Sequence, residues 1–217
     1  MKPNFHQLVE GALCAVATEE PIFQSEASLQ RALASQLKTM TPLLDVQTEV
    51  RLFDNRNTSA DIVLGFRGWK HVVELKYPKQ KLLWTAPDGE IFDLRFGAND
   101  LYRHGILMKI ARVEEFIAAL PQTTGSVVAL TNTAALWKTP KPTGCDAEFN
   151  LGDGALVTGD LDWAPHTAEK IVASYGRVPA FRGRYLARWS PYSDFHVKNG
   201  EFRYLAVSIV DGSEETS

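Results

Sequence analysis

Two short apolar segments joined by a glycine-flanked turn constrain the fold more than any other part of the chain. The segments, residues 62–66 and 71–77, are rich in aliphatic and β-branched side chains, as buried strands are. Gly65 and Gly68 bracket the turn and supply backbone freedom that other residues lack. Pro78 ends the second segment because proline has no N–H to donate to a β-ladder. The pattern predicts a β-hairpin inside a sheet.

Three charged residues interrupt this apolar hairpin. Asp61 begins the first strand, whereas Glu74 and Lys76 lie within the second. Side chains two positions apart on a strand point to the same face, so Glu74 and Lys76 share a face. His71, three positions from Glu74, is expected on the opposite face. A hairpin of this length can bring Asp61 next to Glu74, so that two carboxylates and one ammonium converge.

Such a cluster is costly unless something neutralises it, because like charges repel and unpaired buried charges are poorly tolerated. A bound divalent cation relieves both the repulsion between the carboxylates and the cost of burying their charge. Carboxylate oxygens from Asp61 and Glu74, the carbonyl of Leu75 and water suit Mg²⁺, which uses few protein ligands. This interpretation requires the three charged groups to meet with space for a cation and a phosphate. The alternative is a surface hairpin that carries a solvated Glu–Lys pair of little energetic value.

The spacing of these residues resembles the motif of the PD-(D/E)xK nuclease superfamily. The matching residues are Asp61, an interval of twelve residues, and then Glu74-Leu75-Lys76, with Ala60 in place of the proline of the motif. The resemblance implies that the acidic pair holds Mg²⁺, for which Mn²⁺ can substitute. It also implies that Lys76 positions and activates the attacking water, and that the reaction is phosphodiester hydrolysis.

A fourth candidate residue lies in the helix predicted for residues 25–40. Ser25 is a suitable N-cap, and leucines recur at four-residue steps along the segment. Glu26 precedes Leu29 by three residues and therefore lies on the apolar stripe. In the superfamily the corresponding helix often supplies an extra glutamate, so Glu26 either binds metal or braces Lys76. The alternative is that Glu26 only complements the helix dipole.

The order of the remaining elements extends the resemblance over residues 22–137. A helix at 8–18, a strand at 46–53, a long helix at 99–120 and a strand at 126–131 surround the hairpin. A strand, a helix and another strand in succession favour a right-handed crossover into a parallel neighbour. The expected fold is therefore α/β, with a restriction-endonuclease-like mixed central sheet flanked by helices and additional C-terminal β strands. Residues 1–217 are expected to form a single α/β domain, with a nuclease-like core at about 22–137 and a β-rich extension at about 140–210.

The long helix at 99–120 carries charged residues that are similar to a pattern in bacterial members of the superfamily. The pattern comprises Ala98, Asp100, Arg112 and Glu114, but Lys109 stands where an acid is expected. This departure favours surface salt bridges over a functional role for the helix. 

Other basic residues provide weaker signals of phosphate binding. Residues 79–99 are expected to form a loop or short hairpin in which Lys79 and Lys81 contact phosphate or are merely solvated. A short hairpin is predicted at 155–161, and strands at 181–189 and 202–210. Arginines at 177, 182, 184 and 188 are interspersed with Tyr185 and Trp189, a combination that suits phosphates and exposed bases. A solvated strand face is the alternative.

The composition limits the classes of function that need to be considered. The net charge is −3, so no general basic character advertises nucleic-acid binding. The two cysteines are far apart and lack zinc-binding spacing, which disfavours a disulfide framework and favours a cytoplasmic location. No apolar run approaches membrane-spanning length, and the first residues fit an N-terminal helix better than a signal peptide. 

These observations lead to one functional prediction and one alternative. The sequence predicts a magnesium-dependent nuclease, with a DNA endonuclease as the favoured type. The expected partner is nucleic acid, no membrane partner is expected, and the prediction is compatible with a homodimer. Its site comprises Glu26, Asp61, Glu74 and Lys76, with Asp61, Glu74 and Leu75 as metal ligands. The alternative is a catalytically inactive nuclease-fold protein that binds nucleic acid or a protein partner.

Overall fold

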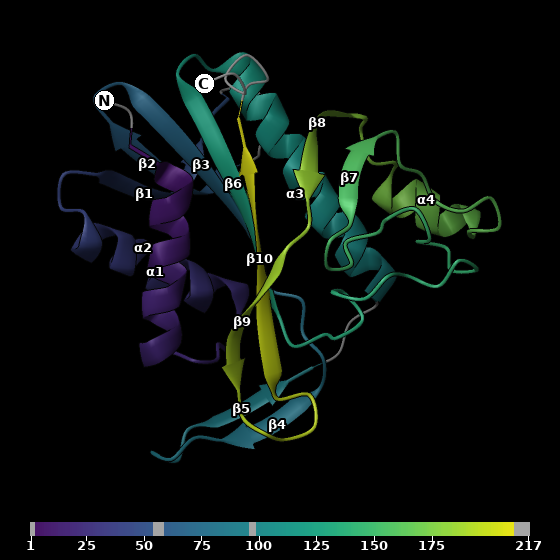
Figure 1. The fold of residues 1–217 in the computed structure, drawn as a ribbon, viewed down its shortest axis with the longest axis horizontal. Coiled ribbons are helices and arrows are strands. Elements are labelled where there is room, and N and C mark those ends of the chain that lie inside the picture. Colours follow the sequence, from purple (N-terminus) through teal and green to yellow (C-terminus); the bar gives the residue numbers. More distant parts are fainter. Residues whose placement is uncertain (1–2, 54–58, 96–98, 211–217) are drawn as a thin grey trace.

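The fold combines helices and a mixed β-sheet (Figure 1). The computed structural model describes residues 3–53, 59–95 and 99–210, except for the side chains of residues 99 and 100. In this part of the chain the elements follow in the order α1 (Phe5–Glu19), α2 (Glu26–Met40), β1 (Asp45–Arg51), β2 (Ser59–Phe66), β3 (Trp69–Lys76), β4 (Leu82–Thr85), β5 (Ile91–Leu94), α3 (Asn99–Ala119), β6 (Thr123–Thr131), β7 (Leu156–Gly159), α4 (Glu169–Tyr175), β8 (Phe181–Leu186), β9 (Trp189–Asp194) and β10 (Glu201–Ile209). The predicted α/β class is therefore confirmed.

The main sheet has the strand order β1-β2-β3-β6-β10-β9 among the described residues. Strands β1, β2 and β3 pair in antiparallel fashion, which confirms the predicted hairpin. Strand β3 then pairs with β6 in parallel, and α3 forms the connection between them, as the crossover prediction required. Strands β10 and β9 complete the sheet with antiparallel pairings. Strand β3 thus lies in the interior of the sheet, hydrogen-bonded on both sides.

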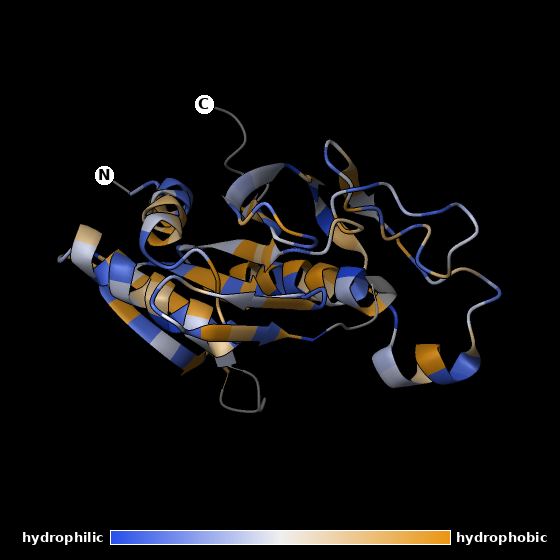
Figure 2. Cartoon of the chain, turned by 90° about the horizontal axis from the view of Figure 1, so that it is seen from below, coloured by the Kyte–Doolittle hydropathy of each residue, from blue (hydrophilic) through white to orange (hydrophobic). Residues whose placement is uncertain are grey.

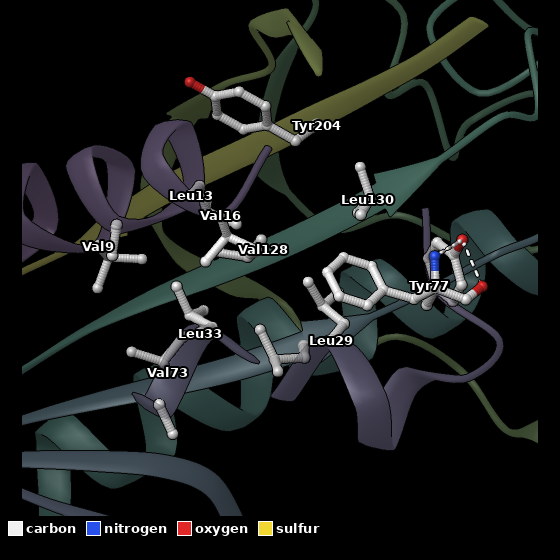
Figure 3. Packing of buried hydrophobic residues seen from close by; sticks show 14 of the residues in the cluster. Val9, Leu13, Val16, Leu29, Leu33, Val73, Tyr77, Val128, Leu130 and Tyr204 are labelled. Atoms are coloured by element: carbon white, nitrogen blue, oxygen red, sulfur yellow. Dashed lines mark hydrogen bonds between the residues drawn. The ribbon is translucent and has the colours of Figure 1, made fainter. Parts of the chain in front are cut away.

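The two faces of the sheet are covered by different helices. Figure 3 shows side chains of α1 and α2 packed against alternate residues of β3 and β6, among them Val73 and Val128. The intervening residues, such as Val72 and Val127, belong to a second buried cluster formed with α3. The period-2 alternation of each strand therefore assigns one set of side chains to α1 and α2 and the other set to α3.

The start of α2 is fixed by its own sequence and by a contact with β3. Ser25 is the N-cap, and its side chain and that of Ser28 form a reciprocal capping box. Just before the helix, the Phe23 N–H donates to the Tyr77 hydroxyl at 3.2 Å, and that hydroxyl donates to the Phe23 carbonyl at 3.0 Å (Figure 3). These bonds hold the first turn of α2, and hence Glu26, beside the end of β3.

Two strand predictions in the C-terminal half need correction. The expected hairpin at 155–161 is wrong, because β7 instead pairs with β8 in a separate two-stranded sheet. The single strand expected at 181–189 is divided between β8 and β9, which belong to different sheets. The short hairpin at 79–99 is confirmed as β4 and β5. Helix α4 has no buried residue and lies at the periphery (Figures 1 and 2). None of the described helices is both long and apolar enough to cross a membrane.

The aromatic residues of the arginine-rich segment are part of the core, and this corrects the hypothesis that they stack on bases. Tyr185 of β8 and Trp189 of β9 are buried, whereas Arg182 and Arg184 of β8 are exposed. The Trp189 indole N–H donates to the Leu151 carbonyl at 2.7 Å. Because the rings are enclosed, only the arginines remain available to a charged partner.

Glu114 of α3 anchors β8 through a buried carboxylate. It accepts hydrogen bonds from the backbone N–H groups of Arg182 at 3.0 Å and Gly183 at 2.9 Å, and from the Tyr185 hydroxyl at 2.6 Å. We expect Glu114→Ala to lower the free energy of unfolding by about 3 kcal/mol, because buried donors lose their acceptor. Urea denaturation measures this change. Glu114→Gln retains an acceptor oxygen and should cost less than half as much; equal losses would contradict the assignment.

Candidate active site

Asp61 and Glu74 lie opposite each other on β2 and β3. The register pairs Ile62 with Val73, so that the preceding and following residues, Asp61 and Glu74, become cross-strand neighbours. The Asp61 carboxylate accepts a hydrogen bond from the Leu75 backbone N–H at 2.7 Å. The Glu74 side chain is completely buried, whereas that of Asp61 is 18% exposed. The predicted convergence of the two carboxylates is therefore present.

The ammonium between these carboxylates belongs to Lys109 of α3. Lys109 Nζ lies 3.0 Å from Asp61 Oδ2 and also donates to Glu74 Oε2. Arg112, one helical turn further along α3, places its Nε 3.4 Å from Glu74 Oε1. The expectation that α3 carries only surface salt bridges is wrong, because Lys109 is 13% exposed and pairs with a buried partner. Ala98, which belongs to the same sequence pattern, lies outside the described residues, as does the side chain of Asp100.

Burial dominates the electrostatics of Glu74. Removal from water raises the pKa of its carboxyl to about 7, and the nearby Asp61 charge acts in the same direction. Lys109 and Arg112 oppose this shift without cancelling it. The pKa of Lys109 is also raised, because the attraction of the two carboxylates outweighs its own partial burial. The site therefore contains Lys109, whose charged form is favoured, beside Glu74, whose charged form is disfavoured.

Lys76 and Glu26 form a second ion pair at the end of β3. Lys76 Nζ lies 3.9 Å from Glu26 Oε1, and the other oxygen of Glu26 accepts from the Tyr77 backbone N–H at 2.8 Å. Both side chains are partly exposed. On the other side, Lys76 lies close to α3, where a Cβ added at Gly105 would be 3.6 Å from Lys76 Cε. Glu26 thus lies within ion-pair distance of Lys76, as the predicted bracing role requires, and that role stays a prediction.

The backbone around Asp61 is held by side chains from three other elements. Gln30 of α2 donates to the Asp61 carbonyl at 2.6 Å and to Glu49 of β1 at 2.8 Å. Glu49 in turn accepts from the Ser59 hydroxyl at 2.9 Å, and Arg112 donates to the Ser59 carbonyl. These contacts connect α2, β1 and α3 at the start of β2, so they fix the position from which Asp61 projects.

Sequence reasoning missed the role of Lys109, although a signal was present. Lys109 lies three residues after Ile106 and four before Val113, both fully buried on the stripe of α3 that faces the sheet. A lysine in such a stripe needs a buried acid as partner. Gln30, which lies four residues after Glu26 on α2, could have been found by the same periodicity.

The donor set is compatible with a hard divalent cation. Two carboxylates from adjacent strands reach one common positive charge, and Asp61 and Lys109 remain partly open to solvent. Among the described residues, Glu74 Oε1 is a buried oxygen that accepts no hydrogen bond, and its nearest cationic partner is Arg112 Nε at 3.4 Å. The described residues contain no group of three or more His, Cys, Asp or Glu side chains placed to hold a metal. A site built here would therefore depend on two carboxylates, a carbonyl and water, as Mg²⁺ allows.

The side chain of Lys79, outside this pair, contacts the protein itself. Lys79 donates to the Gln24 carbonyl at 2.8 Å and lies over the Tyr77 ring, 5.6 Å from its centre. Partial burial lowers the pKa of Lys79. The hypothesis that Lys79 and Lys81 contact phosphate stays a prediction.

Comparison with known proteins adds no relative. No family model, no curated protein and no solved structure matches this chain. The functional assignment therefore depends on the motif in the sequence and on the geometry of the side chains that carry it.

Proposed function

We propose that the protein is a magnesium-dependent nuclease that hydrolyses phosphodiester bonds, with DNA as the substrate and an endonucleolytic mode of cleavage. The observation that carries this proposal is the convergence of Asp61 and Glu74, whose carboxylates meet at the Lys109 ammonium with Arg112 beside Glu74. Two carboxylates held this close on adjacent strands can share one metal ion, and Lys76 lies two residues beyond Glu74 on the same strand. No membrane component enters the proposal, and a homodimer is compatible with it.

The arrangement of elements supports the same proposal. Helix α2, strands β1 to β3, helix α3 and strand β6 follow the order expected for the restriction-endonuclease-like core. The parallel pairing of β3 with β6 and the packing of α3 across both strands agree with the crossover helix of that core. We therefore propose this fold for the first two thirds of the chain, and strands β7 to β10 as additions to it.

The proposed roles follow from the position of each side chain. Asp61 and Glu74, with the Leu75 carbonyl, would hold Mg²⁺ or Mn²⁺. When bound, the ion supplies positive charge that polarises the scissile phosphate and stabilises the departing oxygen. Lys76, paired with Glu26, would orient the attacking water through its ammonium; to take the proton of that water as well, it would first have to release a proton of its own. Gln30 and Arg112 keep the Asp61 strand in register and do not contact the substrate in this proposal.

One observation favours the alternative of an inactive nuclease-fold protein that binds nucleic acid or a protein partner. The space for a cation that the motif requires is occupied by the Lys109 ammonium, which already neutralises the carboxylates. A permanent Lys109 bridge would leave a binding protein, with the exposed arginines of β8 available to a polyanion.

Plasmid cleavage tests the proposed function. Supercoiled DNA incubated with the protein and a large excess of Mg²⁺ or Mn²⁺ should become nicked or linear. Asp61→Asn should abolish the reaction, because it removes one of the two charged ligands. Parallel incubation with single-stranded RNA identifies the preferred polymer. Binding without cleavage under every metal condition would contradict the proposal and favour the alternative.

A further inference from the structure

The charges around the carboxylate pair are already balanced without a metal ion. When both carboxyl groups are ionised, Asp61 and Glu74 contribute two negative charges, and Lys109 and Arg112 contribute two positive charges within ion-pair distance. A divalent cation added to this set would leave an excess of two positive charges in a partly buried site. One of the two basic side chains must therefore move away before such a cation can bind.

The contacts of the two basic residues identify the one that moves. Arg112 is held at three points: it donates to the Ser59 carbonyl, pairs with Glu74, and lies over the Phe116 ring, 5.4 Å from its centre. Lys109 contacts only the two carboxylates through its ammonium in the contacts that the described residues show. A lysine also ends in a compact charge on a flexible four-carbon stem, whereas the guanidinium is planar and fixed by several donors.

We propose that Lys109 is a displaceable counter-ion, which occupies the cation position of the metal-free site and leaves it when a divalent cation binds. This inference depends on the metal site of the proposed function. The ammonium lies within hydrogen-bonding distance of both carboxylates, which is where a shared cation would bind. The side chain borders solvent, so rotation about its stem carries the charge outward without any movement of α3. Metal binding is then a competition between two cations for Asp61 and Glu74.

Competition of this kind predicts that the affinity for Mn²⁺ falls as the side chain at position 109 binds the carboxylates more strongly. Lys109→Met keeps the length of the side chain and removes the charge, so Mn²⁺ should bind at least tenfold more tightly than to the wild-type protein. Lys109→Arg keeps the charge and adds a fork that binds carboxylates at two points, so Mn²⁺ should bind several times more weakly. Titration calorimetry, or the loss of the free Mn²⁺ signal in electron paramagnetic resonance, measures each dissociation constant without reference to activity.

Matched variants exclude a non-specific effect of charge. Lys70→Met removes an exposed lysine from the opposite end of β3 and should leave Mn²⁺ binding unchanged. Asp61→Asn introduced into the Lys109→Met protein should abolish the tighter binding. If the Met variant fails to fold, as judged by circular dichroism, the Arg variant still decides, because unchanged or tighter binding there contradicts displacement.

The outcomes separate this inference from the proposed function. Tighter Mn²⁺ binding by Lys109→Met supports displacement even if no variant cleaves DNA, which would refute only the nuclease. Equal or weaker binding by a folded Lys109→Met protein overturns displacement, even if the wild-type protein cleaves DNA with Mg²⁺. Absence of Mn²⁺ binding in both proteins overturns the inference as well, because Lys109 would then be a permanent partner of the carboxylates.

Discussion

Glu74→Gln is expected to reduce metal-dependent cleavage by about a thousandfold or more, because it removes a charged ligand from the position where a cation stabilises the transition state. The substitution preserves the size of the side chain, and the amide oxygen can still accept from Lys109. Activity should therefore fall without loss of the fold. Initial rates of plasmid nicking at saturating Mg²⁺ measure the effect.

The same variant, which lowers activity, should raise the free energy of unfolding relative to the wild-type protein as the pH increases. Glu74 has a pKa near 7 in the folded protein because burial disfavours its charged form, whereas its ordinary value is 4.5. Stability from the neutral carboxyl is fully present below pH 4.5 and is lost as the pH rises through 7. The shift corresponds to about 3 kcal/mol. Glutamine does not ionise, so the stability of Glu74→Gln relative to wild type should rise by this amount between pH 4 and pH 8.

The control for both effects is a glutamate without this environment. Glu90 lies in the exposed turn between β4 and β5, and Glu90→Gln should alter neither cleavage nor the pH dependence of unfolding. Urea denaturation of the metal-free proteins across this pH range makes the comparison. Parallel stability curves for Glu74→Gln and wild type would show that Glu74 ionises normally, and retained cleavage would remove it from the site.

Lys76→Met is expected to lower the rate of cleavage by about a hundredfold to a thousandfold, the usual contribution of a positioned acid–base group. Metal binding should be unchanged, because the ammonium of Lys76 pairs with Glu26 and not with Asp61 or Glu74, the carboxylates proposed to hold the ion. Single-turnover cleavage rates and Mn²⁺ titration, measured on the same preparation, separate the two properties. 

Lys70→Met provides the matched control, since it removes the same chemical group from an exposed position of the same strand. It should keep wild-type rates. If Lys76→Met cleaves normally while Lys109→Met does not, the activating lysine comes from α3, and the motif assigns the wrong ammonium. The cleavage rate of Glu26→Gln should lie between those of the wild-type protein and Lys76→Met, because this variant keeps Lys76 but removes the charge that pairs with it.

The sequence predicted those features that local periodicity determines. The alternation of apolar and charged residues in β3 placed Glu74 and Lys76 on one face and His71 on the other, and His71 indeed stacks on Phe5 of α1. The hairpin register then followed from the short turn, since a shift by one residue would expose the apolar set. The N-cap of α2 and the crossover through α3 were also predicted, because capping and chirality are local constraints.

Features that depend on packing between distant segments were not predicted. Lys109 is 48 residues from Asp61 in the sequence, and only the rotation of α3 on the sheet decides which of its residues meets the carboxylates. The burial of Tyr185 likewise depends on Glu114, which lies on another element. Strands β8 and β9 are consecutive in sequence but belong to different sheets. The alternation of residues within a single strand does not show which sheet that strand will join.

The central position of β3 has a kinetic consequence. Its amides are bonded to β2 on one side and β6 on the other, so their exchange with solvent deuterium requires rupture of the middle of the sheet. An ion or substrate that reaches Glu74 is therefore expected to enter through rotation of side chains such as that of Lys109, and not through a local opening of the backbone.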